Sequence, residues 1–317
     1  MKRVTMNSVI RVEDFSVSGW RVSEDDSSRA RWYCERLEEG DIVSFSAPPF
    51  ALSDTDRSFL LGVRQRDSAH HKNVSYKPDR DRVSGFRSGS SDAMELRRVM
   101  RRYSESVADF VGKFLLPYSG HWRLDFASFR PLEEENRNLP INKRNDLLHV
   151  DSFPTRPSNG DRILRVFTNL HPDRPRVWIT SDPFPILAEH YARAAGVATL
   201  AAKAKSSPWR ELRRVALRTA RRLGLPAVDR PLYDEFMLHF HDFLKTHQGF
   251  QRDCPKLRTD FAPGSTWMVF TDEVPHAVLS GQFALEQTLI ISRDALLEPE
   301  KAPYRVLEKM AGVSVVD

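Results

Sequence analysis

The chain has 317 residues, of which 40% are hydrophobic and 29% are charged, and its formal net charge is +5. This is an ordinary globular composition that can bury a core, and no apolar run approaches the length of a membrane span. With only two cysteines, Cys34 and Cys254, the sequence excludes a disulfide framework and a cysteine-rich zinc site. We expect a cytoplasmic protein, because the first residues also lack the hydrophobic stretch of a signal peptide.

The N-terminal part is predicted to combine helices with short strands. Its predicted elements are a strand at 9–12, a helix at 27–39, a strand at 41–53 and a helix at 93–116. Gly40 ends the first helix and Asp92 caps the second. Residues 64–92 are polar and basic without a sustained period, so we expect a long loop that is either functional or disordered.

The rest of the chain shows several short strands and one helical stretch. Strands are predicted at 122–129, 147–150, 163–167, 177–179, 266–270 and 288–291. We therefore expect an α+β fold with a mainly β core, a double-stranded β-helix of the jelly-roll or cupin-like kind, with helices packed outside. A single domain, 1–317, is expected to divide into supporting elements at 1–120, core strands at 121–182 and 254–295, and a helical insertion at 183–253.

A possible metal site lies in the strand around residue 149. Alternate residues of a strand point the same way, so His149 and Asp151 can bind one ion while Val150 faces the core. Two histidines and one carboxylate form the facial triad of non-haem Fe(II) oxygenases, and His276, from a later strand, can complete it. The alternative is that these are ordinary polar residues at the end of a strand.

A second His-x-Asp pair, His171 and Asp173, lies in a segment whose two prolines and Asn169 favour a turn, so we prefer the first pair as ligands. Arg165 follows the proposed ligands on a predicted neighbouring strand, where a buried guanidinium needs an anionic partner. The distal carboxylate of 2-oxoglutarate suits that guanidinium, and its keto-acid end chelates iron. A structural Asp or Glu is the alternative partner.

The predicted insertion contains a basic amphipathic helix at 208–223, preceded by Ser207 as a cap. Such a helix can rest on anionic lipid, or it can pack on the core and leave a basic face in solvent. His239 and His241 lie in a segment of helical periodicity, on which their imidazoles diverge, so no shared metal is expected. No glycine-rich nucleotide loop and no nucleic-acid-binding motif is present, so nucleic acid is not an expected partner.

Residues 145–178 and 263–291 together resemble the bacterial 3-deoxy-D-manno-octulosonic acid (Kdo) 3-hydroxylase family, and the similarity includes residues 72–78. The resemblance implies an Fe(II)- and 2-oxoglutarate-dependent dioxygenase that uses O2 to hydroxylate C3 of Kdo in Kdo2-lipid A, giving Ko, succinate and CO2. It carries over His149, Asp151 and His276 as iron ligands.

The resemblance also bears on the anion-binding residues. Many related oxygenases place the residue that binds 2-oxoglutarate on the strand after the distal histidine, where this chain offers Gln287 and then Arg293, a weaker candidate than Arg165. The remaining candidates, for binding the carboxylates and phosphates of the glycolipid, are Arg130, Arg162, Arg174, Arg176, Lys72 and Tyr76. The basic helix is expected to hold the enzyme peripherally on the inner membrane.

Two other functions stay open at this point. A 2-oxoglutarate oxygenase that acts on a protein or a small metabolite shares every predicted ligand. A cupin-like module that binds a metal or a sugar without catalysis belongs to a different class, and the intact triad together with Arg165 argues against it.

Overall fold

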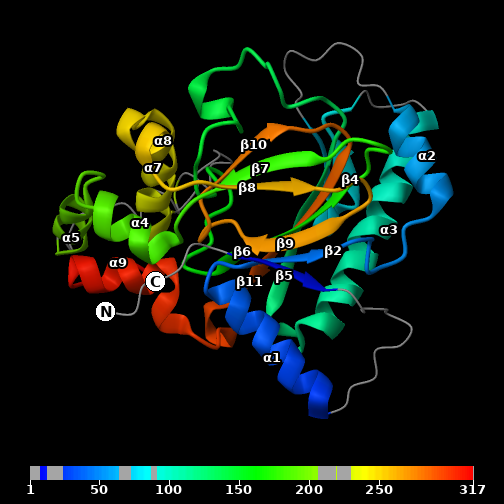
Figure 1. Cartoon of the computed structure of the whole chain (residues 1–317). Helices are drawn as coiled ribbons and strands as arrows, with labels where there is room; N and C mark the ends of the chain where they lie inside the picture. The colour runs from blue at the N-terminus through cyan, green and yellow to red at the C-terminus, as the bar shows by residue number, and fades with distance from the viewer. Residues whose placement is uncertain are drawn as a thin grey trace.

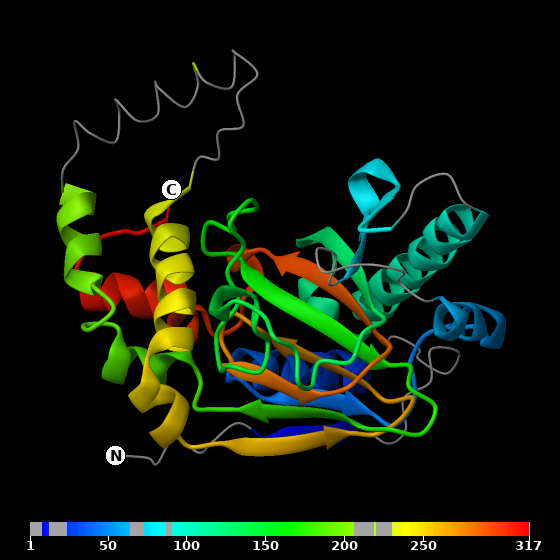
Figure 2. The same ribbon diagram turned by 90° about the horizontal axis from the view of Figure 1, so that it is seen from above.

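The computed structural model describes residues 8–12, 24–63, 73–86, 91–205, 219 and 230–316. In this part of the chain, two β-sheets lie one above the other at the centre, with one group of helices against the large sheet and another group beside one end of the sheets (Figure 1, Figure 2). The architecture is a mixed α/β fold built on one large sheet. No helix among the described residues is both long enough and apolar enough to cross a membrane.

The large sheet has eight strands. In spatial order they are β1 (Val9–Val12), β2 (Ile42–Phe45), β9 (Thr266–Phe270), β6 (Arg162–Asn169), β11 (Ala284–Ile291), β5 (Trp122–Arg130), β3 (Val74–Lys77) and β4 (Arg82–Ser84). Only β1 and β2 are parallel; the other pairs are antiparallel. Leu164 and Val166 of β6 pack on the outer helices, whereas Arg165 and Phe167, which alternate with them, point between the sheets.

The small sheet has three strands, in the order β10 (His276–Ser280), β7 (Arg176–Thr180) and β8 (Leu257–Phe261). An isolated antiparallel bridge between His149 and His276 adds the segment around residue 149 to its β10 edge. Leu148 and Val150 are fully buried against the helices outside this sheet, so the alternating residues His149 and Asp151 face inward. The prediction that Val150 faces the core is confirmed.

Two groups of helices pack against the sheets. The helices over the large sheet are α1 (Glu24–Glu38), α2 (Asp54–Gly62) and α3 (Ser91–Phe114). The helices beside the small sheet are α4 (Phe184–Tyr191), α5 (Val197–Lys205), α7 (Leu232–Thr246), α8 (Gln248–Asp253) and α9 (Pro303–Ala311). Short 3-10 helices lie at Pro78–Arg80, Leu116–Tyr118, Ile141–Lys143, Arg293–Ala295 and Pro299–Lys301.

The structure confirms most of the predicted elements and corrects others. Helices α1 and α3 and strands β5, β6, β7 and β9 lie where the periodicity predicts them. The expected structureless loop at 64–92 is wrong over 73–86, where β3 and β4 form a hairpin that extends the large sheet. Helix α2 and strand β8 were not predicted. The predicted helix at 208–223 and Lys72 lie outside the described residues.

Candidate functional site

The three predicted metal ligands lie together between the sheets. His276 is the first residue of β10, and the bridge from it to His149 also brings Asp151 alongside. One candidate ligand atom from each residue lies within 4.8 Å of the others, and the three residues are at most 8% exposed. The Nε2 atoms of His149 and His276 are each 3.9 Å from an oxygen of Asp151. Two imidazoles and one carboxylate thus converge as a facial triad requires.

Backbone carbonyls fix the orientation of both imidazoles. His149 Nδ1 lies 2.7 Å from Leu147 O, and His276 Nδ1 lies 2.9 Å from Val274 O. Because a carbonyl can only accept, each Nδ1 carries the proton, and each Nε2 presents a lone pair toward Asp151. Burial lowers the pKa of both histidines, and for His149 the neighbouring His276 lowers it further, which favours the neutral form that binds metals.

Asp151 is a buried carboxylate held ionised by its neighbours. Burial opposes its ionisation, but the neighbouring guanidinium of Arg165 outweighs burial and keeps the pKa of Asp151 well below the ordinary range. Arg165 Nη1 lies 2.9 Å from Asp151 Oδ2, yet this oxygen accepts no well-aligned hydrogen bond. An anionic oxygen without an aligned donor, next to two imidazole lone pairs, fits a divalent cation.

Arg165 also belongs to a buried network on the large sheet. Its Nε lies 3.4 Å from Glu286 on β11, and the same carboxylate lies 3.3 Å from Arg130 on β5. Ser128 and Thr288 donate further hydrogen bonds of 2.6 Å to Glu286. Burial raises the pKa of Glu286, but the two arginines and these hydroxyls lower it more, so this carboxylate is ionised. Glu286 therefore orients two guanidinium groups beside the triad.

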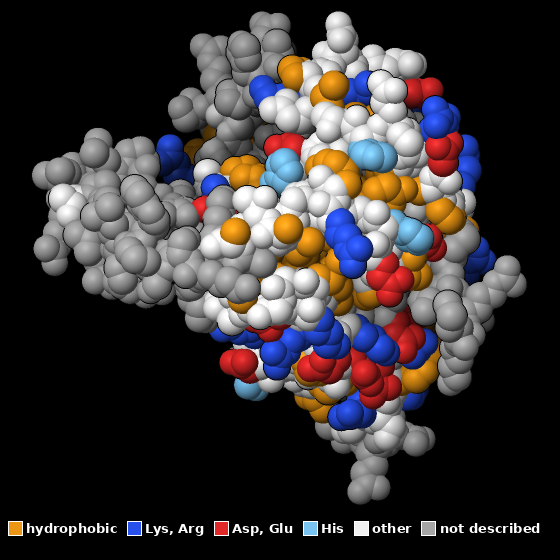
Figure 3. All heavy atoms as spheres, turned by 90° about the vertical axis from the view of Figure 1, so that its left-hand side faces the viewer, with side chains coloured by type: hydrophobic (Ala, Val, Ile, Leu, Met, Phe, Trp, Pro, Cys, Tyr) orange, Lys and Arg blue, Asp and Glu red, His pale blue; other side chains and the backbone are white. Residues whose placement is uncertain are grey.

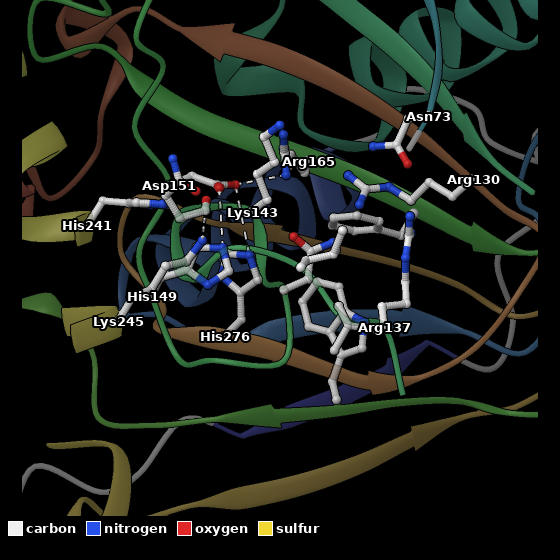
Figure 4. Close-up of a pocket in the computed structure, with 16 residues that line it drawn as sticks. Asn73, Arg130, Arg137, Lys143, His149, Asp151, Arg165, His241, Lys245 and His276 are labelled. Atoms are coloured by element: carbon white, nitrogen blue, oxygen red, sulfur yellow. Dashed lines mark hydrogen bonds and ion pairs between the residues drawn. The ribbon is translucent and has the colours of Figure 1, made fainter. Parts of the chain in front are cut away.

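The triad forms one wall of a pocket of about 380 Å³, a volume that suits a small ligand. Arg130 and Arg165, both predicted to bind anions, line this pocket, and Arg137 adds a third guanidinium (Figure 4). The described lining residues include several cations and one carboxylate, that of Asp151. The pocket is therefore electrostatically suited to an anionic ligand.

Helix α7 contributes two pocket residues that the sequence did not single out for this site. His241 Nδ1 lies 2.7 Å from Val150 O, and its ring packs edge-on against His149 with 4.8 Å between centroids. Lys245, one turn later, also lines the pocket. As predicted, the two nearby histidines diverge, because His239 is exposed. The four-residue spacing of His241 and Lys245 was the available signal that they share a helix face.

Three of the arginines predicted to bind anions lie outside the pocket. Arg162 is 1% exposed and pairs with Asp272 and Glu273. Arg176, also 1% exposed, contacts the carboxylate of Glu134 and donates to a backbone carbonyl. Arg174 is largely exposed and donates to His171. None of the three lines the pocket.

The other candidates have structural partners of their own. Arg293 donates to Asn159 O at 2.7 Å and does not line the pocket, which separates it from Arg165. The Tyr76 hydroxyl bonds to Asp81 at 3.0 Å. His171 and Asp173 lie in the connection between β6 and β7, as the prolines predicted. The structure thus brings together His149, Asp151, His276, Arg165 and Arg130 from the predicted set.

The comparisons with known proteins agree with this geometry. A family model described as 3-deoxy-D-manno-oct-2-ulosonic acid (Kdo) hydroxylase matches residues 20–314. The chain belongs to the Kdo hydroxylase family. Among solved structures, it resembles the Kdo hydroxylase KdoO, a non-haem Fe(II) α-ketoglutarate-dependent dioxygenase, in complex with α-ketoglutarate and Fe(III), with 32% identity over 98% of each chain and a TM-score of 0.81.

Two further structures of KdoO give the same result. The apo form has 31% identity over 98% of each chain and a TM-score of 0.82. The cobalt(II) complex has 32% identity, covers 98% of this chain and 97% of the other, and has a TM-score of 0.81. No curated protein matches the chain. Membership in the Kdo hydroxylase family confirms the resemblance stated from the sequence.

Proposed function

We propose that this protein is an Fe(II)- and 2-oxoglutarate-dependent dioxygenase that hydroxylates C3 of Kdo in Kdo2-lipid A, giving Ko, succinate and CO2. The observation that carries the proposal is the convergence of His149, Asp151 and His276 within 4.8 Å on the wall of a cation-rich pocket. Family membership supports the Kdo substrate. The KdoO structures with iron and α-ketoglutarate support the cofactors.

In this proposal His149, Asp151 and His276 would hold Fe(II), which would also bind the co-substrates 2-oxoglutarate and O2. Bound iron supplies the chemistry that activates O2 and oxidises a C–H bond. The protein keeps both imidazoles neutral and aimed by their Nδ1–H bonds to carbonyls. Arg165 binds the distal carboxylate of 2-oxoglutarate, and Glu286 orients its guanidinium.

The volume of the pocket limits which part of the glycolipid can enter it. A volume of about 380 Å³ accommodates a keto acid beside a sugar but not lipid acyl chains, so the acyl chains stay outside. The buried walls of the pocket exclude water from the oxidised C–H bond. Among the described residues predicted to bind the substrate, Arg130 is the one that lines the pocket and can contact the anionic part of the substrate.

We further take the fold to be a double-stranded β-helix. The order β5-β11-β6-β9 forms the centre of the large sheet, and the 149 segment, β10, β7 and β8 form the small sheet. These eight segments alternate between the sheets in the way that two interleaved antiparallel ribbons do, with β1–β4 added at the edges. The triad then lies on neighbouring segments of the small sheet.

We place the enzyme in the cytoplasm, peripherally on the inner membrane. Its proposed substrate keeps acyl chains in a bilayer, so the enzyme must work at that surface. The basic amphipathic pattern at 208–223 supports contact with anionic lipid.

The test is anaerobic reconstitution with Fe(II) and 2-oxoglutarate, followed by air and Kdo2-lipid A that carries deuterium at C3 of Kdo. Mass spectrometry should find succinate and a glycolipid that has gained one oxygen and lost deuterium. Asp151→Ala removes the carboxylate ligand and should abolish both products. Asp173→Ala, in the second His-x-Asp pair, is the matched control and should retain them.

Other outcomes assign other functions. Succinate with unmodified lipid would mean an oxygenase with another substrate, such as a protein or a metabolite. Oxygen gained without loss of deuterium would move the reaction to another carbon. Neither product, from protein that holds iron, would indicate a binding module. Normal turnover by Asp151→Ala would refute the ligand assignment.

A further inference from the structure

Lys245 on α7 is a buried cation with few partners. The residue is 5% exposed, and its ammonium donates to the backbone carbonyl of Asn142 at 3.3 Å. Among the described residues no carboxylate forms an ion pair with it. An ammonium has three donors and is costly to bury without an anion. Because Lys245 lines the pocket, an anionic ligand there can supply the missing partner.

His241 lies one helical turn before Lys245 and offers the complementary function. Its Nδ1–H donates to Val150 O, so the neutral ring presents Nε2 as an acceptor. An imidazole acceptor suits the hydroxyl groups of a sugar, whereas the ammonium suits a carboxylate. The pair on one face of α7 therefore matches a sugar acid better than a simple anion.

The two kinds of cation approach the triad from different sides. Arg165 projects from β6 between the sheets, while His241 and Lys245 come from a helix outside the small sheet. In the close-up, His241 and Arg165 lie on opposite sides of Asp151 (Figure 4). The proposed reaction needs two carboxylates near iron, the distal one of 2-oxoglutarate and that of Kdo. Two separate cationic positions can hold them without competition.

We propose that His241 and Lys245 form the subsite for the Kdo ring, in which Lys245 binds the sugar carboxylate and His241 accepts a hydrogen bond from a hydroxyl. This inference rests on the proposed function and deepens it. Arg165 remains the residue that binds 2-oxoglutarate. The subsite places a substrate-binding residue on the segment between β7 and β8 rather than on the sheets.

The test is a thermodynamic cycle that removes the Lys245 ammonium, the carboxylate charge of the Kdo ligand, or both. Binding of the methyl glycoside of Kdo, and of its uncharged carboxyl methyl ester, is measured by calorimetry on Co(II)- and 2-oxoglutarate-loaded protein without oxygen. Wild type should prefer the acid by about tenfold or more, as expected for loss of a charge-assisted hydrogen bond. In Lys245→Met this preference should largely disappear, whereas Lys245→Arg should retain it.

The affinity for 2-oxoglutarate is measured on the same proteins. It should stay within about twofold of wild type in Lys245→Met, because Arg165, and not Lys245, is the residue that we assign to 2-oxoglutarate. Lys113→Met, on the outer helix α3, removes the same charge and should change neither affinity. His241→Phe should weaken binding of the acid and of the ester equally.

Three results would overturn the inference. Lys245→Met could bind the acid and the ester with the wild-type preference, which would exclude contact with the carboxylate. It could instead lose affinity for 2-oxoglutarate alone, which would assign Lys245 to the other carboxylate. A wild-type protein that neither binds the Kdo glycoside nor oxidises Kdo2-lipid A would refute the proposed function itself, and the subsite with it.

Discussion

At the scale of single residues, the notable feature of this site is the position of the guanidinium to which we assign anion binding. On β11, where related oxygenases suggested a basic residue, the chain has Glu286 and Gln287. The Gln287 amide donates to the backbone carbonyl of Asp125 at 2.9 Å, so it is not available to a ligand. Glu286 points between the sheets and holds Arg165 of β6 and Arg130 of β5. The cation is thus supplied by the neighbouring strands and fixed by a carboxylate on β11.

Replacing Arg165 tests this arrangement. Arg165→Ala removes the guanidinium that we assign to 2-oxoglutarate. The 2-oxoglutarate concentration needed for half-maximal turnover should therefore rise by about tenfold or more, as expected when a charge-assisted hydrogen bond is lost. Succinate formation over a range of 2-oxoglutarate concentrations measures this. Arg293→Ala is the control and should leave the requirement unchanged, since Arg293 lies outside the pocket. The reverse result would transfer the role to Arg293.

Single residues also show how far the sequence could predict the site. The alternation of His149, Val150 and Asp151 was enough to predict that the side chains of His149 and Asp151 share one side, and the structure confirms this direction. Lys245 and His241 were not predicted as pocket residues, because the spacing of a helix face does not reveal which neighbour that face meets. That neighbour is set by packing between segments about 90 residues apart, as in the His241 contact with Val150.

At the scale of elements, the connection from β9 to β10 decides where His276 lies. Arg162, at the start of β6, binds Asp272 at 2.7 Å and Glu273 at 3.0 Å within this connection. All three side chains are 1% exposed. The sequence suggested Arg162 as a substrate-binding residue, but its charge is used to fasten the connection. A basic residue in a strand pattern does not reveal whether its partner is a ligand or the protein.

Two buried carboxylates around one guanidinium predict a pH-dependent stability. Burial, together with Asp272 and Glu38, raises the pKa of Glu273 from 4.5 to about 8, even though Arg162 lowers it. The folded state therefore binds a proton that the unfolded state releases between these values. Stability from this group is fully present below pH 4.5 and is lost as the pH rises toward about 8.

The matching experiment is urea unfolding between pH 6 and 9. The free energy of unfolding of wild type should fall relative to Glu273→Gln, with a slope of up to about 1.4 kcal/mol per pH unit. Gln keeps the shape and cannot ionise. Glu105→Gln, on the exposed face of α3, should follow wild type. Parallel curves for wild type and Glu273→Gln would show that Glu273 is ionised in the folded protein throughout this range.

Element prediction succeeded where the pattern was local and failed where it was not. The 24-residue helix α3 has a clear apolar stripe and was predicted nearly to its ends. The β3–β4 hairpin was missed because its short strands contain many polar residues, and the pairing of β3 with β5 attaches the hairpin to the sheet. Strand β8 was missed for a similar reason, since three of its residues, Arg258, Thr259 and Asp260, are polar.

At the scale of the whole molecule, the net charge of +5 is not explained by the described surface of the helical layer. Figure 3 shows basic and acidic side chains intermingled on that face. Several of them form exposed ion pairs, including Arg305 with Glu308, Lys309 with Glu300 and Arg252 with Asp253. Such a mixed surface has no single sign and does not attract a membrane.

The segment 208–223, which contains six arginines and no lysine, is our candidate for contact with a membrane. We expect the protein to bind vesicles that contain phosphatidylglycerol and not vesicles of phosphatidylcholine alone, as measured by flotation. Raising the salt from 0.1 to 1 M shortens the screening length from about 10 to about 3 Å and should release it. Reversing Arg213, Arg214 and Arg218 to Glu should abolish binding, whereas charge reversal of the exposed, paired Arg305 should not. Equal binding to both kinds of vesicle, unaffected by salt, would instead indicate apolar insertion and would remove the electrostatic role of this segment.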